Sequence, residues 1–139
     1  MIVLDTNVLS EATRSAPEQR VLDWLAEQQA TSLFTTTISE AEILYGVAAL
    51  PAGRRRTALE DALRRMFSED FPGRVLAFDR SAAAEFALIA SARRSRGRPI
   101  SAFDAQIAAI ARAHGAAVAT RNVSDFDGCG IDVIDPWAA

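Results

Sequence analysis

The sequence predicts an α/β fold in which helices cover both faces of a mostly parallel sheet. Short apolar segments alternate with longer segments of helical periodicity along the 139 residues. The apolar segments are uninterrupted, which is typical of strands that are covered on both faces. Strands separated by helices are joined by crossover connections, and such connections pair strands in parallel. We therefore expect three layers, with helices on either side of a sheet of about five strands.

The first apolar segment is Ile2-Val3-Leu4, and it ends abruptly on Asp5. We expect a buried strand here, followed by a short helical turn from Thr6 to Thr13. In open α/β sheets, ligands bind beyond the carboxyl ends of the strands. Asp5 stands at such an end, so its carboxylate is the first candidate for chemistry.

The other expected elements follow in alternation. Further strands are expected at residues 33–36, 75–78, 117–120 and 131–134. Helices are expected at residues 18–29, 39–50, 54–70, 81–95 and 101–114. The helical residues expected to face the core are Val21, Leu22, Leu25, Ile43, Leu44, Val47, Leu59, Leu63, Phe67, Phe86, Leu88, Ile89, Phe103, Ile107 and Ile110. We expect Trp24 and Tyr45 in the core or an interface, and Trp137 as a packing anchor.

Composition and length predict one globular domain that spans residues 1–139. Half of the residues are apolar and 24% are charged, which excludes a disordered chain. No apolar run approaches the ~20 residues that a membrane-spanning helix needs. The single cysteine, Cys129, has no partner for an internal disulfide, which agrees with a reducing compartment. We therefore expect a cytoplasmic protein.

The charge balance argues against simple nucleic-acid binding, because the formal net charge is -3. All 15 basic residues are arginine, whose planar guanidinium matches phosphate oxygens in a bidentate way. Codon bias would also produce this preference. Arg98 and Arg121 stand beside acidic motifs, and they are therefore our candidates for contacts with RNA phosphates or with a protein partner; an ordinary solvated surface position is the alternative.

Four acids fall at comparable places in this plan, at strand ends or near helix starts: Asp5, Glu42, Asp104 and Asp125. If the strands are parallel, these carboxylates meet at one edge of the sheet. Clustered carboxylates repel one another and need cations, and oxygen ligands favour Mg²⁺ or Mn²⁺. One or two such ions activate water for phosphodiester hydrolysis. The pattern therefore favours a metal-dependent hydrolase of phosphodiesters.

Each acid except Asp5 also has a purely structural interpretation. Glu42 and Asp104 each stand three residues after a serine, as in a capping box at the start of a helix. Asp125 is compatible with an ordinary turn. Capping and metal binding are compatible, because a helix N-terminus favours an ionised carboxylate.

Four segments resemble the PIN-domain nucleases, in particular the VapC toxins of VapBC-type pairs and their FitB-like relatives. They are I-V-L-D-T-N-V-L at 2–9, S-E-A-E-I-L-Y-G at 39–46, G-R-P-I-S-A-F-D-A-Q-I-A at 97–108 and A-T-R-N-V-S-D-F at 119–126. Together they span nearly the whole chain in the family's order. The resemblance implies a metal-dependent endoribonuclease of α/β/α fold that forms a homodimer and is held inactive by an antitoxin.

The resemblance also implies roles for individual residues. Asp5, Glu42 and Asp104 match the three principal metal-binding acids, and Asp125 matches a more variable fourth, for which Asp127 is an alternative. The polar residues beside the first and fourth acids are matched by Thr6, Asn7, Thr120 and Asn122. Their groups could orient the carboxylates or the attacking water, although turn and capping chemistry would also explain them.

Two other functions are compatible with part of the pattern. A phosphatase with an aspartyl nucleophile would also place Asp5 after the first strand. That mechanism needs a second aspartate as general acid two residues later, where Asn7 stands, and it commonly uses a lysine, which this chain lacks. A non-catalytic module could keep the fold and act by pairing with an antitoxin on promoter DNA. The partner would then supply the DNA contacts, given the negative net charge.

Overall fold

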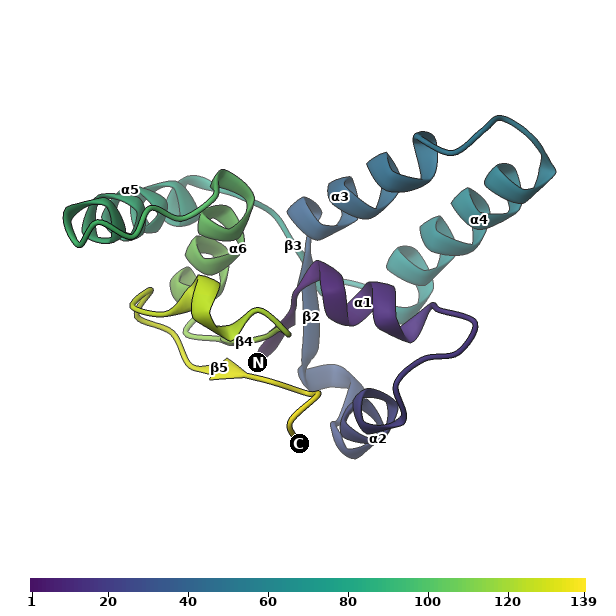
Figure 1. Cartoon of the computed structure of the whole chain (residues 1–139), viewed down its shortest axis with the longest axis horizontal. Coiled ribbons are helices and arrows are strands. Elements are labelled where there is room, and N and C mark those ends of the chain that lie inside the picture. Colours follow the sequence, from purple (N-terminus) through teal and green to yellow (C-terminus); the bar gives the residue numbers. More distant parts are fainter.

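The computed structural model describes residues 1–139 and has the expected architecture, with helices on both sides of a five-stranded parallel sheet (Figure 1). The strand order is β3-β2-β1-β4-β5, and every neighbouring pair is parallel. The strands are β1 Ile2–Leu4, β2 Leu33–Thr36, β3 Val75–Leu76, β4 Ala117–Ala119 and β5 Val133–Ile134. The first strand of the chain is therefore the central strand of the sheet.

Six α-helices connect and cover the strands. They are α1 Thr6–Ala12, α2 Gln19–Glu27, α3 Thr37–Ala48, α4 Arg54–Arg65, α5 Arg80–Ser95 and α6 Ala102–Ala113. Shorter helical segments are η1 Ala30–Ser32, η2 Met66–Asp70 and η3 Val123–Phe126. In Figure 1, α5 and α6 lie on one side of the sheet, whereas α1 to α4 lie on the other. No helix is long and apolar enough to cross a membrane.

Two apolar cores form because successive side chains of β1 point to opposite faces of the sheet. Val3 packs in one cluster with residues of α5 and α6, including Ile89 and Ile107. Leu4 packs in the other cluster with residues of α1 and α2, including Val8 and Val21. The two buried faces fix the orientation of β1, and thereby the position of Asp5 at its carboxyl end.

Three residues that we expected to be buried or at an interface are largely exposed. Leu88 is 57% exposed, whereas its neighbour Ile89 is 1% exposed. Adjacent residues of an α-helix point about 100° apart, so only one of the two faces α6. Phe103 is 55% exposed at the start of α6, and Tyr45 is 78% exposed, so a core position for Tyr45 is wrong.

Several element boundaries also differ from the expected ones. The third strand ends at Leu76, because the chain then leaves the sheet and Asp79 caps α5. The expected helix at 54–70 changes to a π-helical turn after Arg65. Helix α3 begins at Thr37, capped by Thr36, whose hydroxyl accepts the Ser39 amide at 3.1 Å. Ser39 is therefore not the cap, and the capping-box interpretation of Glu42 is wrong.

Candidate active site

Asp5, Glu42 and Asp104 line one cavity of about 410 Å³ beyond the carboxyl end of β1. The three acids come from different elements, since Asp5 directly follows β1, Glu42 belongs to α3 and Asp104 belongs to α6. Trp137 is the only apolar residue of the lining. The parallel topology has therefore brought together three of the four acids that the sequence singled out.

Asp5 is held in a single orientation by hydrogen bonds to both carboxylate oxygens. Its Oδ1 accepts the Thr6 amide at 2.8 Å, so that Asp5 also caps α1. Its Oδ2 accepts the hydroxyl of Thr120 at 2.8 Å and, at 3.4 Å, the side-chain amide of Asn7. Only 5% of Asp5 is exposed. These donors compensate part of the cost of burying a carboxylate.

Thr6 connects the first acid to the second. Its hydroxyl donates to Glu42 Oε1 at 3.0 Å and lies 3.1 Å from the hydroxyl oxygen of Ser39. Ser39 is fully buried and stands on the same helix as Glu42, three residues earlier. Ser39 is missing from the predicted site residues, because a serine three residues before Glu42 also matches a capping box.

Asp104 is positioned by the start of α6. Ser101 caps this helix, and its hydroxyl accepts the Asp104 amide at 3.2 Å. Asp104 therefore stands in the first helical turn, as the sequence predicted. The cap fixes the helix start, and the helix start fixes the direction from which this carboxylate enters the cavity.

The acids raise one another's pKa values. Burial raises the pKa of Asp5 to about 6, the charges of Asp104 and Glu42 add to the rise, and the hydrogen bonds from Thr120 and Thr6 oppose it. Burial also raises the pKa of Glu42, with a further contribution from the charge of Asp104. The pKa of Asp104 is raised by burial and by the charge of Asp125. The cavity is thus a site where negative charge is concentrated.

The lining offers oxygen ligands that suit a hard divalent cation. Asp5, Glu42 and Asp104 offer carboxylate oxygens, and the lining contains no cysteine or histidine. Oxygen ligands of this kind favour Mg²⁺ or Mn²⁺ over softer metals. The carboxylates do not form a closed cage of three ligands around one point. Mg²⁺ keeps several waters and is usually bound by one or two carboxylates together with substrate phosphates. The residues present therefore fit such an ion.

The same cavity has a positively charged side. Arg121 lines it, and the Arg121 guanidinium carbon lies 5.3 Å from the centre of the Trp137 ring. The Arg121 amide donates to Asn7 Oδ1 at 3.2 Å, and the Asn122 amide donates to Thr120 Oγ1 at 3.0 Å. The polar residues that follow the neighbouring strands β1 and β4 are thus joined by hydrogen bonds at the carboxyl edge of the sheet.

A family model described as the PIN domain matches residues 2–127. The chain belongs to the PIN-domain family. It is 42% identical to VapC ribonuclease Y4jK of Sinorhizobium fredii, over 99% of this chain and 98% of that protein. It is 39% identical to Toxin FitB of Neisseria gonorrhoeae, over 99% of each chain.

Solved structures agree with the assignment of this PIN domain. The crystal structure of FitAcB from Neisseria gonorrhoeae superposes with a TM-score of 0.94 at 38% identity and covers 100% of both chains. The structure of FitAB bound to an IR36 DNA fragment superposes with a TM-score of 0.93 at 38% identity, over 99% of this chain and 96% of that chain. The expected PIN-like fold is confirmed.

The fourth acid of this PIN domain lies beside the cavity and is not part of its lining. The charge of Asp125 contributes to the raised pKa of Asp104, which places the two acids in electrostatic contact. The carboxylate of Asp127 instead accepts Arg98 Nη1 at 3.0 Å, in an exposed ion pair. Arg98 therefore does not line the cavity with Arg121.

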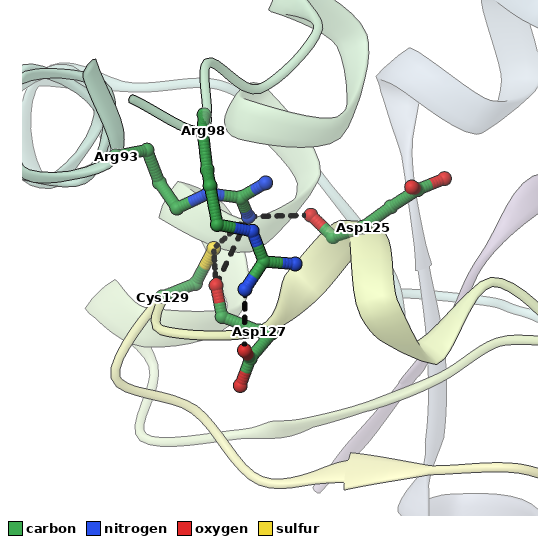
Figure 2. A network of polar contacts seen from close by, with 5 residues as sticks. All are labelled: Arg93, Arg98, Asp125, Asp127 and Cys129. Atoms are coloured by element: carbon green, nitrogen blue, oxygen red, sulfur yellow. Dashed lines mark hydrogen bonds and ion pairs between the residues drawn. The ribbon is translucent and has the colours of Figure 1, made fainter. Parts of the chain in front are cut away.

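A buried arginine holds the loop that carries Asp125 (Figure 2). Arg93 is 5% exposed, and its Nε donates to the carbonyl of Arg98 at 2.7 Å. Its Nη1 donates to the carbonyls of Asp125 at 2.8 Å and Asp127 at 3.0 Å, and lies 3.7 Å from the sulfur of Cys129. In Figure 2 the Asp125 carboxylate points away from Arg93. Arg93 thus fixes the backbone and leaves that carboxylate free.

We expect Arg93→Met to lower the free energy of unfolding by about 3 kcal/mol, because three backbone carbonyls lose a charged donor. Urea denaturation of the purified protein measures this change. Arg94→Met is the matched control, since Arg94 is the exposed neighbour on the same helix. Equal effects of the two substitutions would contradict the structural role of Arg93.

The raised pKa values also predict how stability depends on pH. Burial of Asp5 costs little below about pH 4, where the carboxyl is protonated in both states, and the cost grows as the pH rises through about 6. For Asp5, the change in pKa from 3.8 to about 6 corresponds to about 3 kcal/mol, and because burial is its largest cause, removal of a neighbouring charge recovers only part of this energy. Asp104→Asn removes one charge of this cluster. We therefore expect the variant to gain stability relative to the wild type between about pH 4 and pH 7.

Urea unfolding at the two pH values measures this gain, and Asp23→Asn serves as the control, because Asp23 is exposed on α2. The expected cluster of repelling charges is refuted if Asp104→Asn and Asp23→Asn change stability alike at both pH values.

Proposed function

We propose that this PIN domain is a Mg²⁺- or Mn²⁺-dependent endoribonuclease that acts as the toxin of a toxin–antitoxin pair. The observation that carries the proposal is the meeting of Asp5, Glu42 and Asp104 in one cavity beyond the central strand. The similarity to proteins named VapC ribonuclease and Toxin FitB supports it. The substrate is then RNA, and the reaction is hydrolysis of a phosphodiester bond.

The acids have distinct roles in this proposal. Carboxylates from the set Asp5, Glu42 and Asp104 would hold the divalent cation, with water and a substrate phosphate as its other ligands, and Asp125 would add negative charge beside Asp104. When bound, such an ion activates a water molecule and stabilises the leaving oxygen. With a pKa of about 6, Asp5 is mostly ionised at neutral pH and therefore available as a ligand.

The polar residues around Asp5 orient the site and do not react. Thr6, Asn7 and Thr120 fix the carboxylates of Asp5 and Glu42 through hydrogen bonds, so that the ligands do not have to reorganise when the ion binds. Asn122 donates its amide to Thr120 and holds this residue in turn. Arg121 faces the cavity and would bind a phosphate of the RNA.

The proposed partners follow from the relatives. The structure of FitAB bound to DNA supports pairing of this chain with an antitoxin in a promoter-bound complex. The net charge of -3 implies that the antitoxin would make the DNA contacts. We also propose a homodimer, as the family resemblance implies.

The phosphatase alternative fails on the position of Asn7. That mechanism wants an acid two residues after the nucleophile, and Asn7 is instead an amide that donates to Asp5 and Thr120. The non-catalytic module remains the outcome to expect if the acids can be removed without loss of toxicity.

Cleavage of total cellular RNA tests the proposed function. We expect the purified protein, free of antitoxin, to cut RNA with Mg²⁺ or Mn²⁺ and to stop when EDTA is added. Asp104→Asn should lower the cleavage rate by about 100-fold, because a ligand of the ion is lost. Circular dichroism establishes that the variant is folded.

Two further variants decide the fourth acid. Asp125→Asn should lower the cleavage rate by about tenfold, whereas Asp127→Asn should retain it, because Asp127 is occupied by Arg98. If wild type and Asp104→Asn cut RNA at the same rate, the proposed active site is wrong.

A further inference from the structure

We propose that Arg14 and Arg121 form a binding site for the RNA phosphate next to the one that is cleaved, and that Trp137 positions Arg121 for this role. The inference rests on the proposed ribonuclease function and specifies how its substrate is held. It adds Arg14 and Trp137 to the site, and it separates Arg121 from Arg98, which is paired with Asp127.

The two arginines belong to the cavity that contains the acids. Arg14 stands two residues after the end of α1, and Arg121 follows β4, yet both line the same 410 Å³ space as Asp5, Glu42 and Asp104. A cation held by carboxylates and a pair of guanidinium groups are thus available within one cavity. An RNA strand presents successive phosphates, so a phosphate at the acids brings a neighbouring phosphate toward the arginines.

Arg121 is placed relative to Asp5 by short, direct contacts. Its amide donates to Asn7 Oδ1 at 3.2 Å, and the preceding residue, Thr120, donates its hydroxyl to Asp5 Oδ2 at 2.8 Å. The backbone of Arg121 is therefore fixed to the same residues that orient the acid. A phosphate bound by Arg121 would consequently lie at a defined position relative to Asp5.

Trp137 restricts the side chain of Arg121. The guanidinium lies over the indole ring, with its central carbon 5.3 Å from the ring centre. The ring itself is held, because it packs against the apolar cluster that contains Leu4 and Val8, and the Trp137 amide donates to Asp135 Oδ1 at 2.9 Å. A stacked guanidinium keeps the N–H donors along its edge, which is the geometry that binds phosphate oxygens.

Arg14 is restrained by a buried acid. Its Nη1 contacts Glu11 Oε2 at 2.9 Å, and Glu11, which is 6% exposed, also accepts the amide of Glu18 at 3.1 Å. Hydrogen bonding from Arg14 lowers the pKa of Glu11, which keeps this carboxylate ionised. The Arg14 side chain remains 62% exposed, so its other N–H groups face solvent. Glu11, Arg14 and Arg121 together carry an excess of one positive charge, which favours a phosphate.

Binding of a short, fluorescein-labelled single-stranded RNA tests the inference by fluorescence anisotropy across a KCl series. The full-length protein carries Asp104→Asn in every sample, with Mg²⁺ present, so that cleavage is about 100-fold slower during the binding measurement. We expect Arg14→Gln and Arg121→Gln each to weaken binding by about tenfold. Each should also reduce the slope of log K against log salt by about 0.7, as for one lost phosphate contact on a single strand.

Trp137→Leu tests the positioning role. It should weaken binding by several-fold with the salt slope unchanged, because the charge of Arg121 remains. In combination with Arg121→Gln it should cause no further loss, which a general structural effect would not produce. Arg94→Gln is the matched control, since Arg94 is exposed on α5 and does not line the cavity.

The outcomes separate this inference from the proposed function. Suppose that the protein cuts RNA. If the arginine variants then bind RNA like the control, or if the labelled RNA does not bind at all, the proposed phosphate site is wrong and the proposed nuclease activity is retained. If the variants bind RNA normally but lose affinity for the antitoxin, the arginines are antitoxin contacts and the inference falls. If RNA binding depends on both arginines but no metal supports cleavage, the proposed function falls instead.

Discussion

The burial of the Asp5 carboxylate beyond the central strand, next to the partly buried acids Glu42 and Asp104, is the constraint on which the rest of this structure depends. Asp5 is buried because β1 lies at the centre of the sheet and is covered on both faces. Two nearby acids raise its pKa further, and hydrogen bonds from Thr6 and Thr120 relieve only part of that cost. A divalent cation would offset the remaining cost of the ionised Asp5 carboxylate. The clustered acids therefore lower the stability of the folded protein and at the same time favour binding of the ion.

The fold assembles this site from segments that lie far apart in the sequence. Parallel strands bring Asp5 and Thr120 to the same edge of the sheet, and the second turn of α3 and the first turn of α6 add the carboxylates of Glu42 and Asp104 from the two flanking layers. Arg93 holds the last loop through its backbone carbonyls, so that the side chain of Asp125 stays free beside Asp104 (Figure 2). Arg14 and Arg121 line the same cavity and would bind the phosphates of the proposed RNA substrate next to the ion.

The sequence predicted the parts of this arrangement that depend on local pattern. Uninterrupted apolar strands identified the sheet and the convergence of Asp5 with Asp104, and the serine cap at Ser101 identified the start of α6. It misplaced residues whose environment is decided by tertiary contacts: Leu88 and Ile89 are equally apolar neighbours, and only the position of α6 shows which one is buried. The local sequence does not single out Arg93, because two of the three carbonyls that it binds belong to a loop more than 30 residues away.

The most direct measurement of the central claim is the location of the metal in crystals of the antitoxin-free protein soaked in Mn²⁺, by anomalous diffraction. We expect a manganese peak in the cavity, coordinated by carboxylate oxygens from the set Asp5, Glu42 and Asp104, with water completing the shell. In Asp5→Asn crystals treated alike, the peak should be lost or greatly weakened. Manganese bound only elsewhere, or an unchanged peak in the variant, would contradict the claim that these acids form the metal site.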